Sequence, residues 1–254
     1  MVILKYLIGV GIENMKKSYK IEQECINFIK NSPINNTIRS FYYEDEIYIL
    51  YIHFSLKNED NENNCIYSQG VTTPLYSFLN KKTFRLNFNF FNCKNHEDII
   101  KEFKILFSHE FVHIQQRNGF SKQLIKGKYF PAPGVLSDLD KNKLKNNMQL
   151  LLHRLEPREI DGYLAMYKTS LVVNKIKIEN YKDGFFWWPY MSQNVSIIDD
   201  LKKETENDVN EIWKQLTGLD WTKNKIILKL EKENELVMQY WKNKTIKLAY
   251  KYAK

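Results

Sequence analysis

The sequence predicts an α+β fold, with strands in the first part of the chain and helices after them. Residues 83–90 alternate between apolar and polar side chains, which is typical of a strand with one buried face. Residues 38–43 and 47–56 are rich in β-branched and aromatic side chains, and the acidic residues between them predict a turn that joins the two as a hairpin. From residue 95 onward the periodicity is helical. Strands followed by helices, in place of regular alternation, favour the α+β class.

Helices are expected where apolar residues recur at helical spacing, in residues 14–30, 95–118, 140–152, 157–173, 197–213 and 223–252. Asn95 is a suitable N-cap for the second of these helices, and Gly119 is a suitable C-terminal stop. Pro157 lies where the first turn of a helix accepts proline.

Length and composition fit a globular protein. The chain has 254 residues, of which 43% are hydrophobic and 14% aromatic, enough to form a core without disulfide bonds. We expect a single domain over residues 1–254, with a strand-rich half, residues 1–120, that ends in the long helix, and a helical half, residues 121–254. The net charge of +8 permits a nucleic acid partner, but 30 acidic residues are interspersed with 38 basic ones, which favours an ordinary solvated surface.

One motif in the long helix carries chemistry. Residues 109–113 read His-Glu-Phe-Val-His, which is HExxH. Residues four apart lie on one face of a helix, so His109 and His113 can reach the same metal ion. Glu110 is angled away from the metal and can take a proton from a metal-bound water. The alternative is a pair of core histidines that bond to neighbouring carbonyl groups.

A catalytic zinc site of this kind needs a third protein ligand and an open fourth position. The metzincin pattern HExxHxxGxxH does not hold, because Gln116 and Gly119 stand where its glycine and its third histidine belong. A cysteine ligand of the peptide deformylase kind is also unsupported, since Cys93 lies in Phe-Asn-Cys-Lys and not in a Gly-Cys-Leu-type loop. The third ligand is therefore expected to be a carboxylate from a later helix.

Residues 156–165 read Glu-Pro-Arg-Glu-Ile-Asp-Gly-Tyr-Leu-Ala. Together with HExxH they resemble the gluzincin branch of the zincin metallopeptidases. The chain is similar in particular to small phage or mobile-element metallopeptidases whose second motif is ExxA, followed by an aromatic residue and another alanine. Matched residue by residue, Glu159 takes the place of the ligand glutamate, and Gly162 and Ala165 take the places of the two small residues. The resemblance covers residues 101–168.

The resemblance implies a zincin-like fold, with a small twisted sheet packed on the HExxH helix and a mostly helical C-terminal half that carries the third zinc ligand. It also implies a strand that borders the cleft and pairs with an extended substrate, for which residues 83–90 are the candidate. A plain core strand is the alternative. Tyr163, four residues after Glu159, is a candidate second electrophile near the developing oxyanion, with ordinary packing as its alternative.

Glu159 has rivals as the third ligand. Glu156 precedes Pro157 and is expected to lie outside the helix. Asp161 is expected to point elsewhere on the helix, where it can orient a zinc-bound imidazole. His153 is a nitrogen alternative.

These expectations describe a zinc-dependent peptidase with Glu110 as the general base. The alternatives are a catalytically silent zinc-binding structural or virion-associated protein, and a DNA-associated metalloprotease. The cysteines, Cys25, Cys65 and Cys93, are widely spaced and form no CxxC pair, which predicts a reducing compartment and so a cytoplasmic protein. A virion-associated protein is the alternative that goes with the resemblance to phage metallopeptidases. No signal peptide is recognised in the apolar residues 1–12, and no segment has the length of a membrane span.

Overall fold

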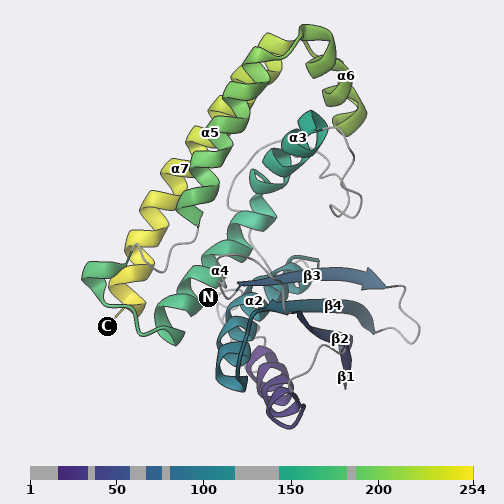
Figure 1. Ribbon diagram of the computed structural model, residues 1–254, viewed down its shortest axis with the longest axis vertical. Coiled ribbons are helices and arrows are strands. Elements are labelled where there is room, and N and C mark those ends of the chain that lie inside the picture. Colours follow the sequence, from purple (N-terminus) through teal and green to yellow (C-terminus); the bar gives the residue numbers. More distant parts are fainter. Residues whose placement is uncertain are drawn as a thin grey trace, which may run out of the picture. The chain divides into compact units, whose positions relative to one another are not determined.

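The computed structural model describes residues 17–33, 38–57, 67–75, 81–117, 143–181 and 187–253 (Figure 1). The chain divides into two units, Met1–Phe120 and Ser121–Lys254. In its described part the first unit holds a mixed sheet and helices, and the second unit is helical. The predicted α+β class is confirmed, while the assignment of the whole chain to one domain stays a prediction.

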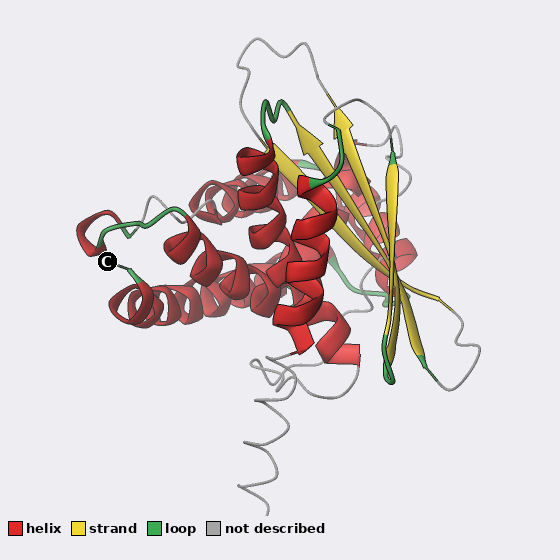
Figure 2. Cartoon of the chain, turned by 90° about the horizontal axis from the view of Figure 1, so that it is seen from below, coloured by secondary structure: helices red, strands yellow, loops and turns green. Residues whose placement is uncertain are grey.

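The strands of the first unit are β1 (Arg39–Glu44), β2 (Tyr48–Lys57), β3 (Tyr67–Leu75) and β4 (Lys82–Phe91). They form a four-stranded sheet in the order β1-β2-β4-β3. The β2–β4 pair is parallel, and the β1–β2 and β3–β4 pairs are antiparallel. Figure 2 shows the twist of this sheet. The predicted hairpin and the strand at residues 83–90 are confirmed, and β3 is a strand that the sequence did not predict.

The acidic turn of the hairpin has a clear physical basis. Asp45 Oδ1 accepts hydrogen bonds from the backbone N–H groups of Ile47 and Tyr48, both at 2.7 Å. The Asp45 N–H in turn donates to the Tyr48 carbonyl at 3.0 Å. The side chain thus satisfies backbone groups that the turn leaves outside the ladder.

Two helices pack on one face of the sheet. Residues 17–30 are helical, and α2 runs from His96 to Arg117. The predicted N-cap of α2 is confirmed, because Asn95 Oδ1 accepts a hydrogen bond from the Asp98 backbone N–H at 2.9 Å. Phe28 of the first helix stacks on Phe54 of β2, with ring centroids 5.7 Å apart. Phe103 of α2 meets the same Phe54 ring at 5.7 Å, so both helices share this core.

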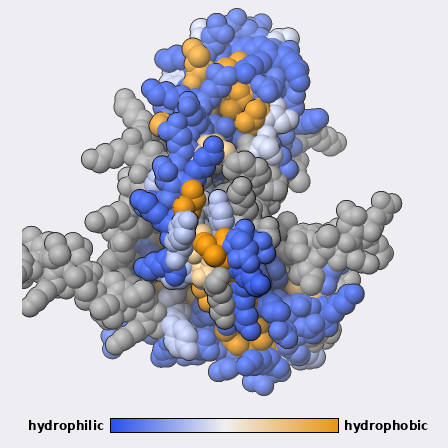
Figure 3. All heavy atoms as spheres, turned by 90° about the vertical axis from the view of Figure 1, so that its left-hand side faces the viewer, coloured by the Kyte–Doolittle hydropathy of each residue, from blue (hydrophilic) through white to orange (hydrophobic). Residues whose placement is uncertain are grey.

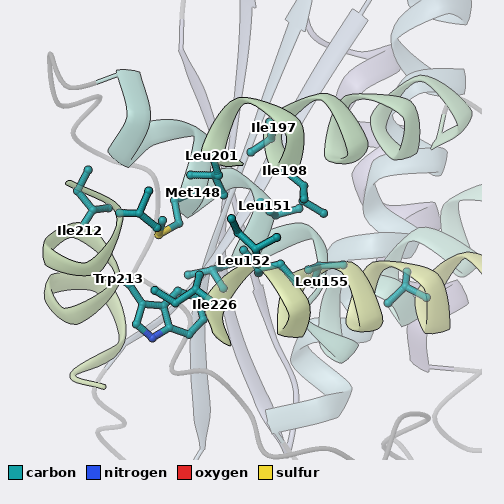
Figure 4. Close-up of a cluster of buried hydrophobic side chains, with 14 of the residues drawn as sticks. Met148, Leu151, Leu152, Leu155, Ile197, Ile198, Leu201, Ile212, Trp213 and Ile226 are labelled. Carbon is teal, nitrogen blue, oxygen red and sulfur yellow. The ribbon is translucent and has the colours of Figure 1, made fainter. Parts of the chain in front are cut away.

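The helices of the second unit are α3 (Lys143–Arg154), α4 (Pro157–Val173), α5 (Trp187–Lys203), α6 (Glu206–Thr217) and α7 (Lys223–Tyr252), with a short 3-10 turn at Ile178–Asn180. Figure 1 shows α5 and α7 side by side. The core gathers buried side chains from all five helices, including Leu164 of α4. Figure 4 shows part of this cluster, with Met148, Leu151, Ile197, Leu201, Ile212, Trp213 and Ile226 among the labelled residues. The predicted limits of α4 and α7 are confirmed, and α3 covers most of its predicted span.

The prediction of one helix over residues 197–213 is wrong, because the chain forms two helices there. α5 already begins at Trp187, and α6 begins after Thr205. Thr205 has an extended backbone, and its hydroxyl accepts a hydrogen bond from the Asp208 N–H at 3.2 Å, as an N-cap does. Both helices bury residues in the same cluster, so the apolar pattern continues across the break.

A chain of polar side chains, of which Arg154, Asn194 and Asn234 are buried, ties α3 to α5 and α7. Arg154, at the end of α3, donates from Nη2 to Gln193 Oε1 at 2.9 Å and from Nη1 to Asn194 Oδ1 at 3.3 Å. Asn194 Nδ2 then donates to Asn234 Oδ1 of α7 at 3.2 Å. These bonds fix the last turn of α3, which also carries His153.

The surface view in Figure 3 shows hydrophobic residues in small separate groups among hydrophilic ones. Exposed apolar residues such as Leu228 and Tyr250 of α7 are ordinary when they stand singly. In the part of the chain that the structure describes, no helix is long and apolar enough to cross a membrane. The predictions for residues 1–12 and for Gly119 lie outside the described residues.

Phe88→Ala is expected to lower the free energy of unfolding of the first unit by about 3–5 kcal/mol. Phe88 is fully buried, and its ring lies 5.8 Å from Phe54 and 5.2 Å from Phe103, so truncation leaves a cavity between sheet and helix. Hydrogen exchange of the β2 and β4 amides in increasing denaturant measures the change. Tyr51→Ala, at a β2 side chain that is 41% exposed, is the control and should cost less than about 1 kcal/mol. Equal losses in both variants would contradict this account of the core.

Candidate metal centre

The rotation of α2 about its own axis is set by its apolar stripe. Ile99, Phe103 and Ile114 are buried and recur at helical spacing. Glu110 follows Phe103 by seven residues, two helical turns, and so lies on the same stripe. His109 and His113 lie on the flank of this stripe, one turn apart. The helix therefore turns its glutamate toward the sheet and its two histidines to one side.

The two histidines of HExxH converge. His109 Nε2 and His113 Nε2 lie 2.9 Å apart, and the two rings are nearly perpendicular, with centroids separated by 4.6 Å. His109 is only 6% exposed. Two imidazole nitrogens that point at one spot are the arrangement from which a metal ion can be held.

Glu110 lies against β3. Thr72 Oγ1 donates a hydrogen bond to Glu110 Oε2 at 2.6 Å. A Cβ placed on Gly70 would come within 2.8 Å of Glu110 Oε1. Residues 70 and 72 are two apart in the strand and so face the same side of the sheet. The carboxylate is thus bounded by two β3 residues that the sequence reasoning did not identify.

The sequence carried only a weak signal for β3. Val71, Thr72 and Thr73 are β-branched, but Gly70 and Pro74 interrupt the run, and both residue types are depleted in strands. Among the described strands, β3 lies at the edge of the sheet, where proline is tolerated. The only signal for β3 in the sequence was this run of three β-branched residues, which precedes the clearly alternating strand β4.

The hypothesis that residues 83–90 pair with a substrate is wrong. β4 is bonded on one side to β2 and on the other to β3, so neither of its edges is open to a further chain. Phe84, Leu86, Phe88 and Phe90 are all buried, which confirms the alternative of a plain core strand.

The predicted third ligand belongs to the second unit. Glu159 lies in the first turn of α4, which begins at Pro157, and it is only 7% exposed. His153 Nε2 lies 3.5 Å from Glu159 Oε2. Ligand atoms of His153, Glu156 and Glu159 all lie within 4.8 Å of one another. The structure therefore gathers Glu159 with two of its three rivals, and the joining of Glu159 to His109 and His113 stays a prediction.

Asp161 and Tyr163 have other surroundings within the second unit. Burial and, after it, the negative charge of Asp161 raise the pKa of Tyr240 on α7 to about 12. Two residues apart on a helix, Asp161 and Glu159 are turned about 200° from one another, so they project from different sides of α4, as their places in the sequence predict. Tyr163 is half-buried and packs against the hydrophobic cluster of this unit, which agrees with a packing role. Its predicted role as an electrophile stays a prediction.

The two described cysteines are not arranged as metal ligands. Cys25 and Cys93 are both buried free thiols. Burial raises the pKa of both thiols, that of Cys93 to about 12. Among the described residues, neither thiol belongs to a group of side chains that could hold a metal ion.

Burial singles out the predicted acidic residues. Among the aspartates and glutamates whose side chains the structure describes, Glu110 and Glu159 alone are buried, at 3% and 7% exposure. Of the described histidines, His109 is the most deeply buried. Buried ionisable groups are costly to stability, and they collect at functional sites.

Comparison of the chain with family models, with curated proteins and with solved structures gives no match. What supports a function for this chain is therefore the geometry and chemistry of its own residues.

Proposed function

We propose that this chain is a zinc-dependent peptidase. In this proposal His109 and His113 bind the zinc ion, Glu159 supplies the third ligand, and Glu110 acts as the general base in the hydrolysis of peptide bonds. The observation that carries it is the convergence of the two Nε2 atoms, 2.9 Å apart, beside a buried glutamate on the same helix.

The donor set fits zinc. Imidazole nitrogen and carboxylate oxygen are usual zinc ligands, and two nitrogens at 2.0–2.1 Å from a tetrahedral zinc lie about 3.3 Å apart. The separation of 2.9 Å between the two imidazole nitrogens is close to that value. Three protein ligands would leave a fourth position open, which is the pattern of catalytic and not of structural zinc sites.

The chemistry divides between the metal and Glu110. When bound, zinc would polarise the scissile carbonyl and lower the pKa of a coordinated water. Glu110 is held on the sheet-facing side of α2, next to both histidines but not among the predicted ligands. From there its carboxylate can accept a proton from the attacking water and pass it to the leaving amine nitrogen.

The burial of Glu159 and its place at the start of α4 support its role as third ligand. The first turn of a helix favours a carboxylate. His153, 3.5 Å away, can orient this carboxylate, as residues behind a metal ligand commonly do.

Purified protein is expected to contain close to one zinc ion per chain, and His109→Ala and His113→Ala should each lose it. Removal of either imidazole breaks the converging pair on which the site depends. Elemental analysis after dialysis against a weak chelator measures the zinc content. His53→Ala is the control, because His53 lies on the sheet face opposite the buried Ile52 and Phe54 and should not affect zinc. A zinc-free wild-type protein under zinc-replete conditions would contradict the proposal.

Glu110→Gln is expected to keep its zinc and to lower kcat by at least about 100-fold, the lower end of the range for loss of a general base. Glutamine keeps the size and hydrogen-bonding reach of the side chain but cannot accept the proton. Cleavage of a proteome-derived peptide mixture, read by mass spectrometry of new termini, measures the activity. Zinc loss in this variant would make Glu110 a ligand. A wild-type protein that binds zinc but cleaves no peptide would favour the catalytically silent alternative.

Glu159→Ala is expected to weaken zinc binding in a chelator competition, while Asp161→Asn leaves the affinity for zinc unchanged. The two residues lie on the same helix, but two positions apart they project from different sides of it. Thermal unfolding of each variant without metal controls for a general loss of structure. If Glu156→Gln or His153→Ala abolishes binding and Glu159→Ala does not, the role of third ligand passes to that rival.

A further inference from the structure

Glu110 is held from β3 as well as from its own helix. A glutamate side chain has three rotatable bonds, so on a helix surface its carboxylate samples many positions. Here the Thr72 hydroxyl donates to Oε2 at 2.6 Å and lies 3.4 Å from the Glu110 backbone carbonyl. Thr72 is β-branched and sits in a paired strand opposite Leu86, so its own side chain has little freedom.

Gly70 has a complementary role. An added Cβ would lie 2.8 Å from Glu110 Oε1, 3.1 Å from its Cγ and 3.2 Å from its Cδ. A contact under 3 Å requires a shift, and the contacted group is the carboxylate end of the glutamate. Any larger residue at this position would therefore push the carboxylate out of its present place.

We propose that Thr72 and Gly70 are positioning residues for Glu110. Thr72 holds one carboxylate oxygen by a hydrogen bond, and the absence of a side chain at Gly70 leaves space for the other oxygen. The inference rests on the proposed function, in which that second oxygen receives the proton of the attacking water. β3 is then part of the catalytic arrangement through its contacts with Glu110.

The geometry predicts a specific kinetic pattern. Thr72→Val keeps the shape of the side chain and removes the donor, so kcat should fall about 10- to 100-fold, because small misplacements of a catalytic group have effects of this size. KM and zinc content should stay near the wild-type values. Thr72→Ser retains the hydroxyl and should recover kcat to within about threefold of wild type. Gly70→Ala should lower kcat in the same way as Thr72→Val.

Thr73→Val is the matched control. Thr73 undergoes the same chemical change on the same strand, but it faces the other side of the sheet from Thr72. It should leave kcat unchanged. Equal losses in the Thr72 and Thr73 variants, or a Thr72→Ser variant as impaired as Thr72→Val, would overturn the inference, because the effect would then be a general weakening of β3.

A double-mutant cycle in the metal-free protein tests the contact without any activity. Thr72→Val should lower the Tm by on the order of 3–6 °C when Glu110 is present, since it leaves a buried carboxylate without this donor. The same substitution should have little effect in a Glu110→Ala background. Equal shifts in both backgrounds would overturn the inference. If the cycle shows coupling but the wild-type protein hydrolyses no peptide, the proposed function fails and the contact stands.

Discussion

The position of the candidate site depends on how helix α2 is buried against the sheet. Phe103 packs edge-on against Phe54 and Phe88, with ring centroids 5.7 and 5.2 Å away. A helix repeats every 3.6 residues, so once this apolar stripe is buried, the direction of every other side chain on the helix is fixed. The two histidines of HExxH and the glutamate between them therefore take their directions from the core of the first unit. The metal-binding pattern and the packing pattern are carried by one helix and cannot be adjusted separately.

The sequence allowed good prediction where the determining signal was local. The start of α2 at His96 follows from the cap at Asn95, and the start of α4 follows from Pro157, because both residues act on the turn in which they stand. The hairpin followed from an acidic turn whose side chain bonds to its own backbone. In each case the residues that determine a helix start or a turn lie within a few positions of it in the sequence.

Prediction was poorer where the signal was tertiary. The strand β3 is stabilised by pairing with β4 and by contact with α2, and neither is visible in a stretch that contains Gly70 and Pro74. The hydrophobic periodicity of α5 and α6 hid the cap at Thr205, because both helices face one cluster. The contact between Thr72 and Glu110 joins residues far apart in the chain, so only the fold could reveal it.

The two buried carboxylates show where the demands of stability and of chemistry diverge. A buried glutamate is costly unless charged or polar partners compensate it, and an apolar residue of similar size often serves stability as well or better. Glu110 has the Thr72 hydroxyl as a partner, and Glu159 has His153. In each unit the fold thus places a specific polar partner beside a buried carboxylate. Packing alone would not require a carboxylate at either position. Such arrangements are expected at functional sites, where a sequence departs from what stability favours. Two compensated buried glutamates, one of them within HExxH, are what the proposed zinc-dependent peptidase requires of its general base and its third ligand.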